Sequence, residues 1–233
     1  MPLVYSSELY HHGIKGQRWG VRRFQNPDGS LTPEGVIRYR KHDTARSVYM
    51  KAAQQEPRIT ANVIRSAKNS GVKLYGLDHR LKTKASIQRK IGKKMEEDDL
   101  SLTESANSIN DAVRYTTISN NKSFVDKYNK FKNEMKSAGY EEIKCKNYFM
   151  LYKQCKVKHK SVQCLFRSPN GYIFEIQFQT PESQKAKDLK VPIYEERRQV
   201  GISNERAKEL EDMMVELAEK VPYPNGIQKI KSF

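Results

Sequence analysis

The chain has 233 residues, and its 43 Lys and Arg exceed its 27 Asp and Glu, so the net charge is +16. A surplus of this size attracts polyanions, which makes a nucleotide, RNA, DNA or an anionic surface the expected partner, unless the charge serves solubility alone. No apolar run approaches the roughly 20 residues needed to cross a bilayer, and the three cysteines form no disulfide-like framework. We therefore expect a soluble protein of a reducing compartment, without a cleavable signal peptide.

The first 42 residues differ from the rest of the chain. They are dense in glycine, basic and aromatic residues and show neither a helical nor a strand period. Residues 26–29 (NPDG) predict a turn, and residues 32–34 predict the start of a short helix. The run HHGIKGQRWGVRR resembles a leader on proteins encoded among the structural genes of tailed phages. We therefore divide the chain into a docking segment, 1–42, whose implied partners are phage structural proteins, and a domain, 43–233.

Helical and strand patterns alternate through the rest of the chain. The predicted helices cover 43–70 with a break at Pro57, about 86–95, 124–138, 181–199 with an interruption at Pro192, and about 204–221. The predicted strands cover 72–77, 113–118, 143–149 and the two arms of a hairpin within 158–182. This order predicts an α+β fold, with a mixed sheet of about five strands flanked by helices.

The hairpin can be assigned a register from its side-chain pattern. A three-residue loop, Pro169-Asn170-Gly171, with Gly171 in the left-handed conformation makes one face of the hairpin uniformly apolar. It sets Phe166 opposite Phe174, Cys164 opposite Ile176 and Val162 opposite Phe178. A two-residue loop would mix the faces. The other face then carries Ser161, Gln163, Leu165, Glu175, Gln177 and Gln179. Such a face is either a place for chemistry or an ordinary solvent-facing strand.

Basic residues gather around the start of the helix predicted near Ser86. They are Arg80, Lys82, Lys84, Arg89 and Lys90. Cations beside the N–H groups of a helix start are what a triphosphate requires. The next strand begins with Asp111, a carboxylate suited to Mg²⁺, and Arg114, and the hairpin adds Glu175. Two carboxylates beside a basic helix start are typical of metal-assisted phosphoryl transfer.

At these residues the chain resembles the synthetase domain of the RelA/SpoT family, the alarmone synthetases, and its small relatives that act as toxins. The resemblance covers about residues 59–199 and keeps four motifs in order. The family pattern R-x-K-x-x-x-S-I-x-x-K matches residues 80–90, and E-[IV]-Q-[IF]-x-T matches residues 175–180. The pattern D-x-x-G-x-R is shortened to Asp111-x-x-Arg114, and Y-x-S-x-H aligns with residues 159–163, where His159 and Gln163 replace the tyrosine and histidine.

The resemblance implies a nucleotidyltransferase-like fold and an ATP-dependent pyrophosphokinase. ATP would be the pyrophosphate donor, a ribose 3′-hydroxyl the acceptor and Mg²⁺ the metal. The implied ATP-binding residues are Arg80, Lys82, Ser86 and Lys90. The implied catalytic residues are Asp111, Glu175 and Arg114, with Asp111 and Glu175 as metal ligands. The implied acceptor-binding residues are His159, Ser161, Gln163, Tyr148 and Gln177.

The acceptor that the resemblance implies is a guanine nucleotide or, as in the toxin relatives, the 3′ end of tRNA. Six lysines interleaved with aromatic residues between 144 and 160 make a ledge that fits RNA, or else a solvated strand pair. Two other functions stay open. One is a phage virion structural protein with a degenerate, non-catalytic synthetase fold, and the other is a nucleic-acid-binding module without catalysis. The expected location is the bacterial cytoplasm or, for the structural protein, the virion.

Overall fold

A mixed sheet of five strands lies at the centre of the protein. The computed structural model describes residues 24–26, 30–199 and 201–233. The strands are β1 (Lys73–Tyr75), β2 (Arg114–Ile118), β3 (Glu141–Asn147), β4 (Val162–Arg167) and β5 (Ile173–Gln179). Their order across the sheet is β1-β2-β5-β4-β3, with β2 and β5 parallel and the other neighbours antiparallel. This confirms the predicted α+β fold with a five-stranded mixed sheet.

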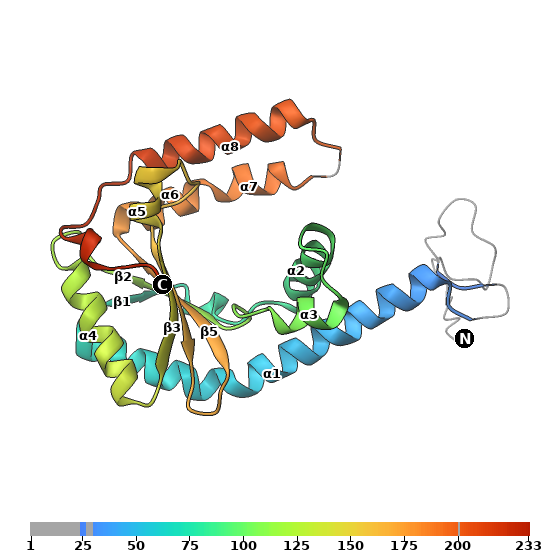
Figure 1. Ribbon diagram of the computed structural model, residues 1–233, viewed down its shortest axis with the longest axis horizontal. Helices are drawn as coiled ribbons and strands as arrows, with labels where there is room; N and C mark the ends of the chain where they lie inside the picture. Colours follow the sequence, from blue (N-terminus) through green and yellow to red (C-terminus); the bar gives the residue numbers. More distant parts are fainter. Residues whose placement is uncertain (1–23, 27–29, 200) are drawn as a thin grey trace, which may run out of the picture.

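Helices flank the sheet on its apolar face and at one end. They are α1 (Pro33–Ser70), α2 (Lys84–Glu97), α3 (Leu102–Asn107), α4 (Phe124–Ser137), α5 (Tyr148–Gln154), α6 (Pro181–Leu189), α7 (Val191–Arg197) and α8 (Asn204–Glu219). Figure 1 shows α1 running beneath the sheet with α4 beside it, while α6, α7 and α8 form an arm above it. Among the described residues, no helix has the length and apolarity that a membrane crossing requires.

The hairpin of β4 and β5 has the predicted register. Phe166 pairs with Phe174, Cys164 with Ile176 and Val162 with Phe178. The backbone N–H of Ser168 donates to the carbonyl of Tyr172, which leaves a three-residue loop, and Gly171 adopts φ 86°. The apolar face of the hairpin packs on α4, where the Phe178 ring lies 4.9 Å from the ring of Tyr128. The opposite face is therefore left for polar side chains.

Helix α1 corrects the predicted break at Pro57. It begins after Thr32, whose side chain caps it, and continues through Pro57 to Gly71, which ends it with φ 70°. An interior proline costs about 3 kcal/mol. Here Ala52 and Ile59 are buried on either side of it, and that packing holds the helix together. The division at residue 42 falls inside α1 and stays a prediction. The leader motif lies in residues 1–23, outside the described residues.

Helix α5 was not predicted. The strand predicted over residues 143–149 ends at Asn147, and α5 begins at the next residue. The side chain of Asn147 accepts a hydrogen bond from Met150 N at 3.2 Å and donates to the carbonyls of Ile227 and Ile230. Asn147 is therefore a helix cap and an anchor for the C-terminal segment at once. The short helix buries Phe149 and Tyr152.

The predicted ledge of lysines and aromatic rings is formed only in part. Phe149 and Tyr152 of α5 are buried in the core, whereas Tyr148 is half-buried and lines a cavity. Lys160 is buried and donates to the carbonyls of Glu219 and Val221. Lys156 and Lys158 form ion pairs with acidic residues of α8. Two of the six lysines are thus ion-paired within the chain and a third is buried, whereas Lys144, Lys146 and Lys153 are exposed.

Candidate active site

Arg114 and Glu175 lie side by side on the polar face of the sheet, because they are register partners on the parallel strands β2 and β5. Gln177 donates from Nε2 to Oε1 of Glu175 at 2.5 Å, and Lys187 of α6 donates to Oε1 of Gln177 at 2.9 Å. Gln179 donates to the same oxygen at 3.3 Å. The polar face therefore carries a hydrogen-bonded chain that runs from α6 to the Glu175 carboxylate.

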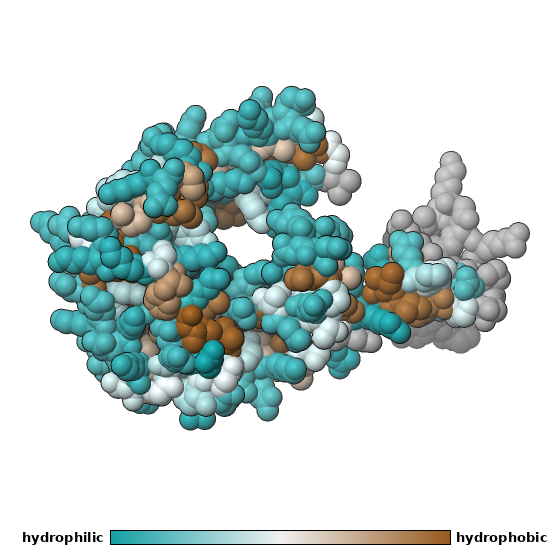
Figure 2. Space-filling model, in the orientation of Figure 1, coloured by the Kyte–Doolittle hydropathy of each residue, from teal (hydrophilic) through white to brown (hydrophobic). Residues whose placement is uncertain are grey.

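A cavity of about 450 Å³ opens between this face and the helices α6, α7 and α8. Figure 2 shows the molecule hollowed below the arm that these helices form. The basic residues on its wall are Arg114, Lys158, Lys160, Lys187 and Lys190, against the acidic Glu195. An apolar part of the wall comes from Val191, Tyr194 and Met214. A ligand with both anionic groups and an apolar body, such as a nucleotide, matches this lining.

Lys187 and Lys190 hold buried positive charge in this cavity. Burial, with Arg114 nearby, lowers the pKa of Lys187 to about 8. Burial also lowers the pKa of Lys190 to about 8, with a contribution from Lys160. Lys190 donates to the carbonyl of Lys158, and Lys187 donates to the side-chain oxygen of Gln177, so both ammonium groups bond to neutral acceptors. An anion that enters the cavity would relieve the repulsion among these cations.

We expect the affinity of this cavity for GDP to fall as the pH rises through about 8. An anion raises the lowered pKa values, so binding takes up protons near that pH, is strongest below it and is lost above it. Each ammonium lost should cost roughly tenfold or more in affinity, because a hydrogen bond to a charged group is worth about 1.5–3 kcal/mol. Calorimetry in two buffers of different ionisation enthalpy measures the affinity and the number of protons taken up on binding. Lys187→Met should make the affinity depend less on pH. An affinity that does not change with pH would contradict the role of Lys187 and Lys190 in binding the anion.

A second group of charges surrounds Asp111, just before β2. Its carboxylate lies 3.2 Å from Lys82 Nζ and 2.7 Å from Lys90 Nζ of α2. Backbone hydrogen bonds from Lys82 to Ala112 and from Arg114 to Arg80 hold the two segments together. Burial raises the pKa of the Asp111 carboxyl, but the two lysines more than offset it, so the pKa lies below its usual value. Burial and the neighbouring Arg114 lower the pKa of Lys82.

The other two predicted ATP ligands have different surroundings. The Arg80 guanidinium bonds to Glu56 of α1 and to the Leu77 carbonyl, so α1, and not Asp111, holds it. Its backbone carbonyl accepts from Arg114 N at 2.8 Å. Ser86 lies in the first turn of α2, where its N–H donates to Thr83 Oγ1, the helix cap. Ser86 is thus at the helix start, as predicted.

The five predicted acceptor residues lie together. The rings of Tyr148 and His159 are 4.3 Å apart, and Gln163 contacts His159 Nε2 at 3.3 Å. Gln163 and Gln177 are register partners on β4 and β5. Gln163 also donates to Ser161 at 3.4 Å. Burial, with Lys190 and Lys187, lowers the pKa of His159 to about 4, so its ring is neutral at pH 7.

Glu175 faces a neighbouring cavity of about 170 Å³ that Tyr148, Lys144 and Lys146 also line. Burial and the Glu175 carboxylate raise the pKa of Tyr148. Oxygen donors of two carboxylates match the chemistry that Mg²⁺ prefers. Glu175 fits, because the side chain bonded to its carboxylate is the neutral Gln177. Asp111 fits only if Lys82 and Lys90 turn from its oxygens to the phosphates of a ligand.

Lys187 and Lys190 are site residues that sequence reasoning missed. Both lie on the helix pair that follows β5, and both line the large cavity. The available signal was the position of α6 directly after the strand that carries Glu175. Helical spacing places Gln184, Lys187 and Val191 on one side of that segment. The sequence alone did not show that this side turns toward the sheet.

The sequence matches no protein-family model and no curated protein. The structure is similar to small alarmone synthetase 2 from Bacillus subtilis, at 18% identity over 75% of this chain and 91% of that chain, with a TM-score of 0.48. It is also similar to small alarmone synthetase 1 from the same organism bound to its product pppGpp, at 15% identity over 74% and 88%, TM-score 0.46. A third similar structure is the complex of the Type VI effector Tas1 and its immunity protein, at 21% identity over 78% and 80%, TM-score 0.40. At this level of similarity, the activity has to be argued from the residues of this chain.

Proposed function

We propose that the protein transfers the β,γ-pyrophosphate of ATP to the ribose 3′-hydroxyl of a nucleotide. The supporting observation is the pairing of Glu175 with Arg114 on adjacent strands, between a cationic cavity and the Asp111 cluster. In the reaction, the 3′-oxygen attacks the β-phosphorus, and the bond from that phosphorus to the oxygen bridging the α-phosphate breaks. AMP leaves, and the hydroxyl proton goes to Glu175.

Each residue of the site has its own role in the proposed transfer. Lys82 and Lys90 bind the ATP phosphates from the head of α2, and Arg114 stabilises the negative charge that develops during transfer. Glu175 takes the proton, which a carboxylate does well when one hydrogen bond from Gln177 fixes its orientation. Mg²⁺, when bound by Glu175 and Asp111, supplies a Lewis acid for the phosphoryl oxygens. Arg80, tied to Glu56, keeps the segment before Lys82 in place.

A mononucleotide is the acceptor that the geometry favours. The cavity of about 450 Å³ is within the range of sites for small molecules and is walled by α6, α7 and α8. The adjacent Tyr148 and His159 rings, tilted by 51° to each other, offer an aromatic surface beside it. The lysine ledge that favoured RNA is reduced, because α8 pairs with Lys156 and Lys158 and two aromatic residues of α5 are buried. We therefore place tRNA second.

The test is incubation with γ-³²P-ATP and Mg²⁺, in separate reactions with GDP, GTP and deacylated tRNA. We expect a labelled nucleotide product that requires Mg²⁺. Label on tRNA instead would keep the reaction and change the acceptor. Absence of label from every acceptor would favour the structural protein. Salt-sensitive RNA binding that is unchanged when Asp111 or Glu175 is substituted would favour the binding module.

A further inference from the structure

A bulge in β3 gathers polar groups within the apolar core. Glu142 pairs with Phe166 and Lys144 pairs with Leu165, so Ile143 is an extra residue on β3. In a regular strand, Glu142 and Cys145 would point to opposite faces. The extra residue reverses the alternation and turns both to the same face, as bulges do. Cys145 lies directly opposite Cys164 of β4. One carboxylate and two thiols therefore meet on the side of the sheet that α4 covers.

The three side chains are close together and shielded from water. The sulfur atoms of Cys145 and Cys164 are 3.5 Å apart, and one ligand atom from each of the three residues lies within 4.8 Å of the others. Both cysteines are fully buried, and the Glu142 side chain is 2% exposed. Oxygen Oε2 of Glu142 contacts Lys132 as an ion pair but accepts no hydrogen bond from a described residue. A buried carboxylate in this state has bonding capacity left for a cation.

We propose that Glu142, Cys145 and Cys164 supply three of the four ligands of a tetrahedral divalent transition-metal ion of the Zn²⁺ class. A Zn–S bond of about 2.3 Å and a tetrahedral angle place two sulfurs about 3.7 Å apart, close to the observed separation. Thiolates with one carboxylate are a donor set that Zn²⁺ accepts. Two thiolates and a carboxylate carry three negative charges, which the ion and the Lys132 ammonium balance. The core then holds a neutral assembly.

Tyr128 of α4 closes the site. Its hydroxyl donates to Glu142 Oε1 at 2.7 Å and lies 3.7 Å from Cys145 Sγ. Such a partner orients a ligating carboxylate. With ligands on β3 and β4 and their partner on α4, the ion joins the edge of the sheet to the helix that covers it.

Cobalt substitution tests the site without reference to catalysis. The reduced full-length protein, stripped with a chelator, is titrated with Co²⁺. We expect thiolate-to-cobalt charge-transfer bands and the intense visible bands of a tetrahedral ion, saturating at one ion per chain and bleached by Zn²⁺. Absence of these bands in the reduced, folded protein would overturn the proposal. The readout is independent of pyrophosphate transfer, so failure of one leaves the other standing.

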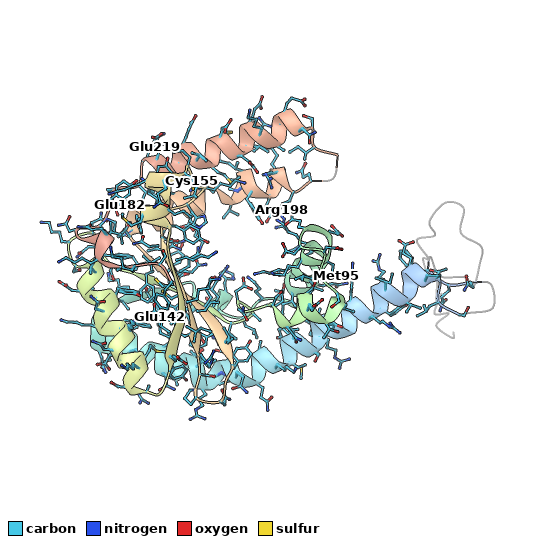
Figure 3. The ribbon with its side chains drawn as sticks, viewed as in Figure 1. Met95, Glu142, Cys155, Glu182, Arg198 and Glu219 are labelled. Atoms are coloured by element: carbon cyan, nitrogen blue, oxygen red, sulfur yellow. The ribbon has the colours of Figure 1, made fainter. Side chains whose placement is uncertain are left out.

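Two alanine variants locate the ion. Cys164→Ala should lose the charge-transfer bands, whereas Cys155→Ala, an exposed cysteine, should keep them. Figure 3 shows Cys155 at the end of α5, apart from Glu142 on β3. If Cys164→Ala does not fold, Tyr128→Phe keeps the ligands and should weaken Co²⁺ binding roughly 10–100-fold while retaining the bands. Loss of the bands in Cys155→Ala, or unchanged affinity in Tyr128→Phe, would count against the site.

Discussion

Replacing Glu175 with glutamine should lower the rate of pyrophosphate transfer by roughly 10²–10⁴-fold, the usual contribution of a general base. The amide keeps the shape of the side chain and its neighbour Gln177, but it can neither take the hydroxyl proton nor hold a metal ion by its charge. Glu175 lies on the polar face of β5, outside the apolar core, so the variant should fold with an unchanged unfolding midpoint. Initial rates at saturating ATP measure the loss of activity, and urea unfolding of the same preparation measures the unfolding midpoint.

The matched control is Glu141→Gln. Glu141 is also a glutamate on a strand, the first residue of β3. It is exposed and forms an ion pair with Arg167 at 3.1 Å on the far edge of the sheet. The same chemical change there should leave the rate intact, because exposed ion pairs contribute little. A Glu175→Gln enzyme that retains the full rate would remove Glu175 from the mechanism. Equal losses in both variants would point to a general effect of charge.

The parts of the fold predicted from sequence are those that local patterns determine. The hairpin register followed from strict alternation and from Gly171, and both are properties of neighbouring residues. The α2 start followed from its basic cluster and the Ser86 motif. The parallel pairing that sets Arg114 beside Glu175 joins residues far apart in the chain, and no local pattern indicates it. The resemblance supplied both residues; their adjacency came from the fold.

The missed features share one physical origin, which is tertiary packing that overrides a local signal. Pro57 is a helix breaker by itself, yet the buried residues on either side keep α1 continuous. Arg80 belongs to a phosphate-binding pattern, yet Glu56, 24 residues earlier, holds its guanidinium. Lys190 looks like an ordinary surface residue in the sequence, and it becomes a buried cation only because α6 and α7 fold over the sheet.

Asp111→Asn should destabilise the protein by about 3 kcal/mol, the lower end of the cost of removing one partner from a buried ion pair. The Asp111 and Lys82 side chains are 13% and 17% exposed, so Lys82 would be left facing Lys90 and Arg114 with little water to screen it. Urea unfolding at constant m-value measures the change. Adding Lys82→Met should recover part of the loss, because the unpaired buried cation is gone. Asp98→Asn, an exposed partner of Lys94 on α2, is the control and should change stability by a few tenths of a kcal/mol.

The same variant separates the two roles assigned to Asp111. In the wild type, the carboxylate competes with ATP phosphates for Lys82 and Lys90, so its removal should tighten binding of a non-hydrolysable ATP analogue when Mg²⁺ is absent. If Asp111 also holds Mg²⁺, the gain in affinity that the metal gives the wild type should disappear in the variant. Tighter binding without Mg²⁺ together with an undiminished metal effect would make Asp111 a partner of the lysines alone. Glu175 would then be the single carboxylate left to hold the ion, and the phosphates would have to supply the remaining oxygen ligands.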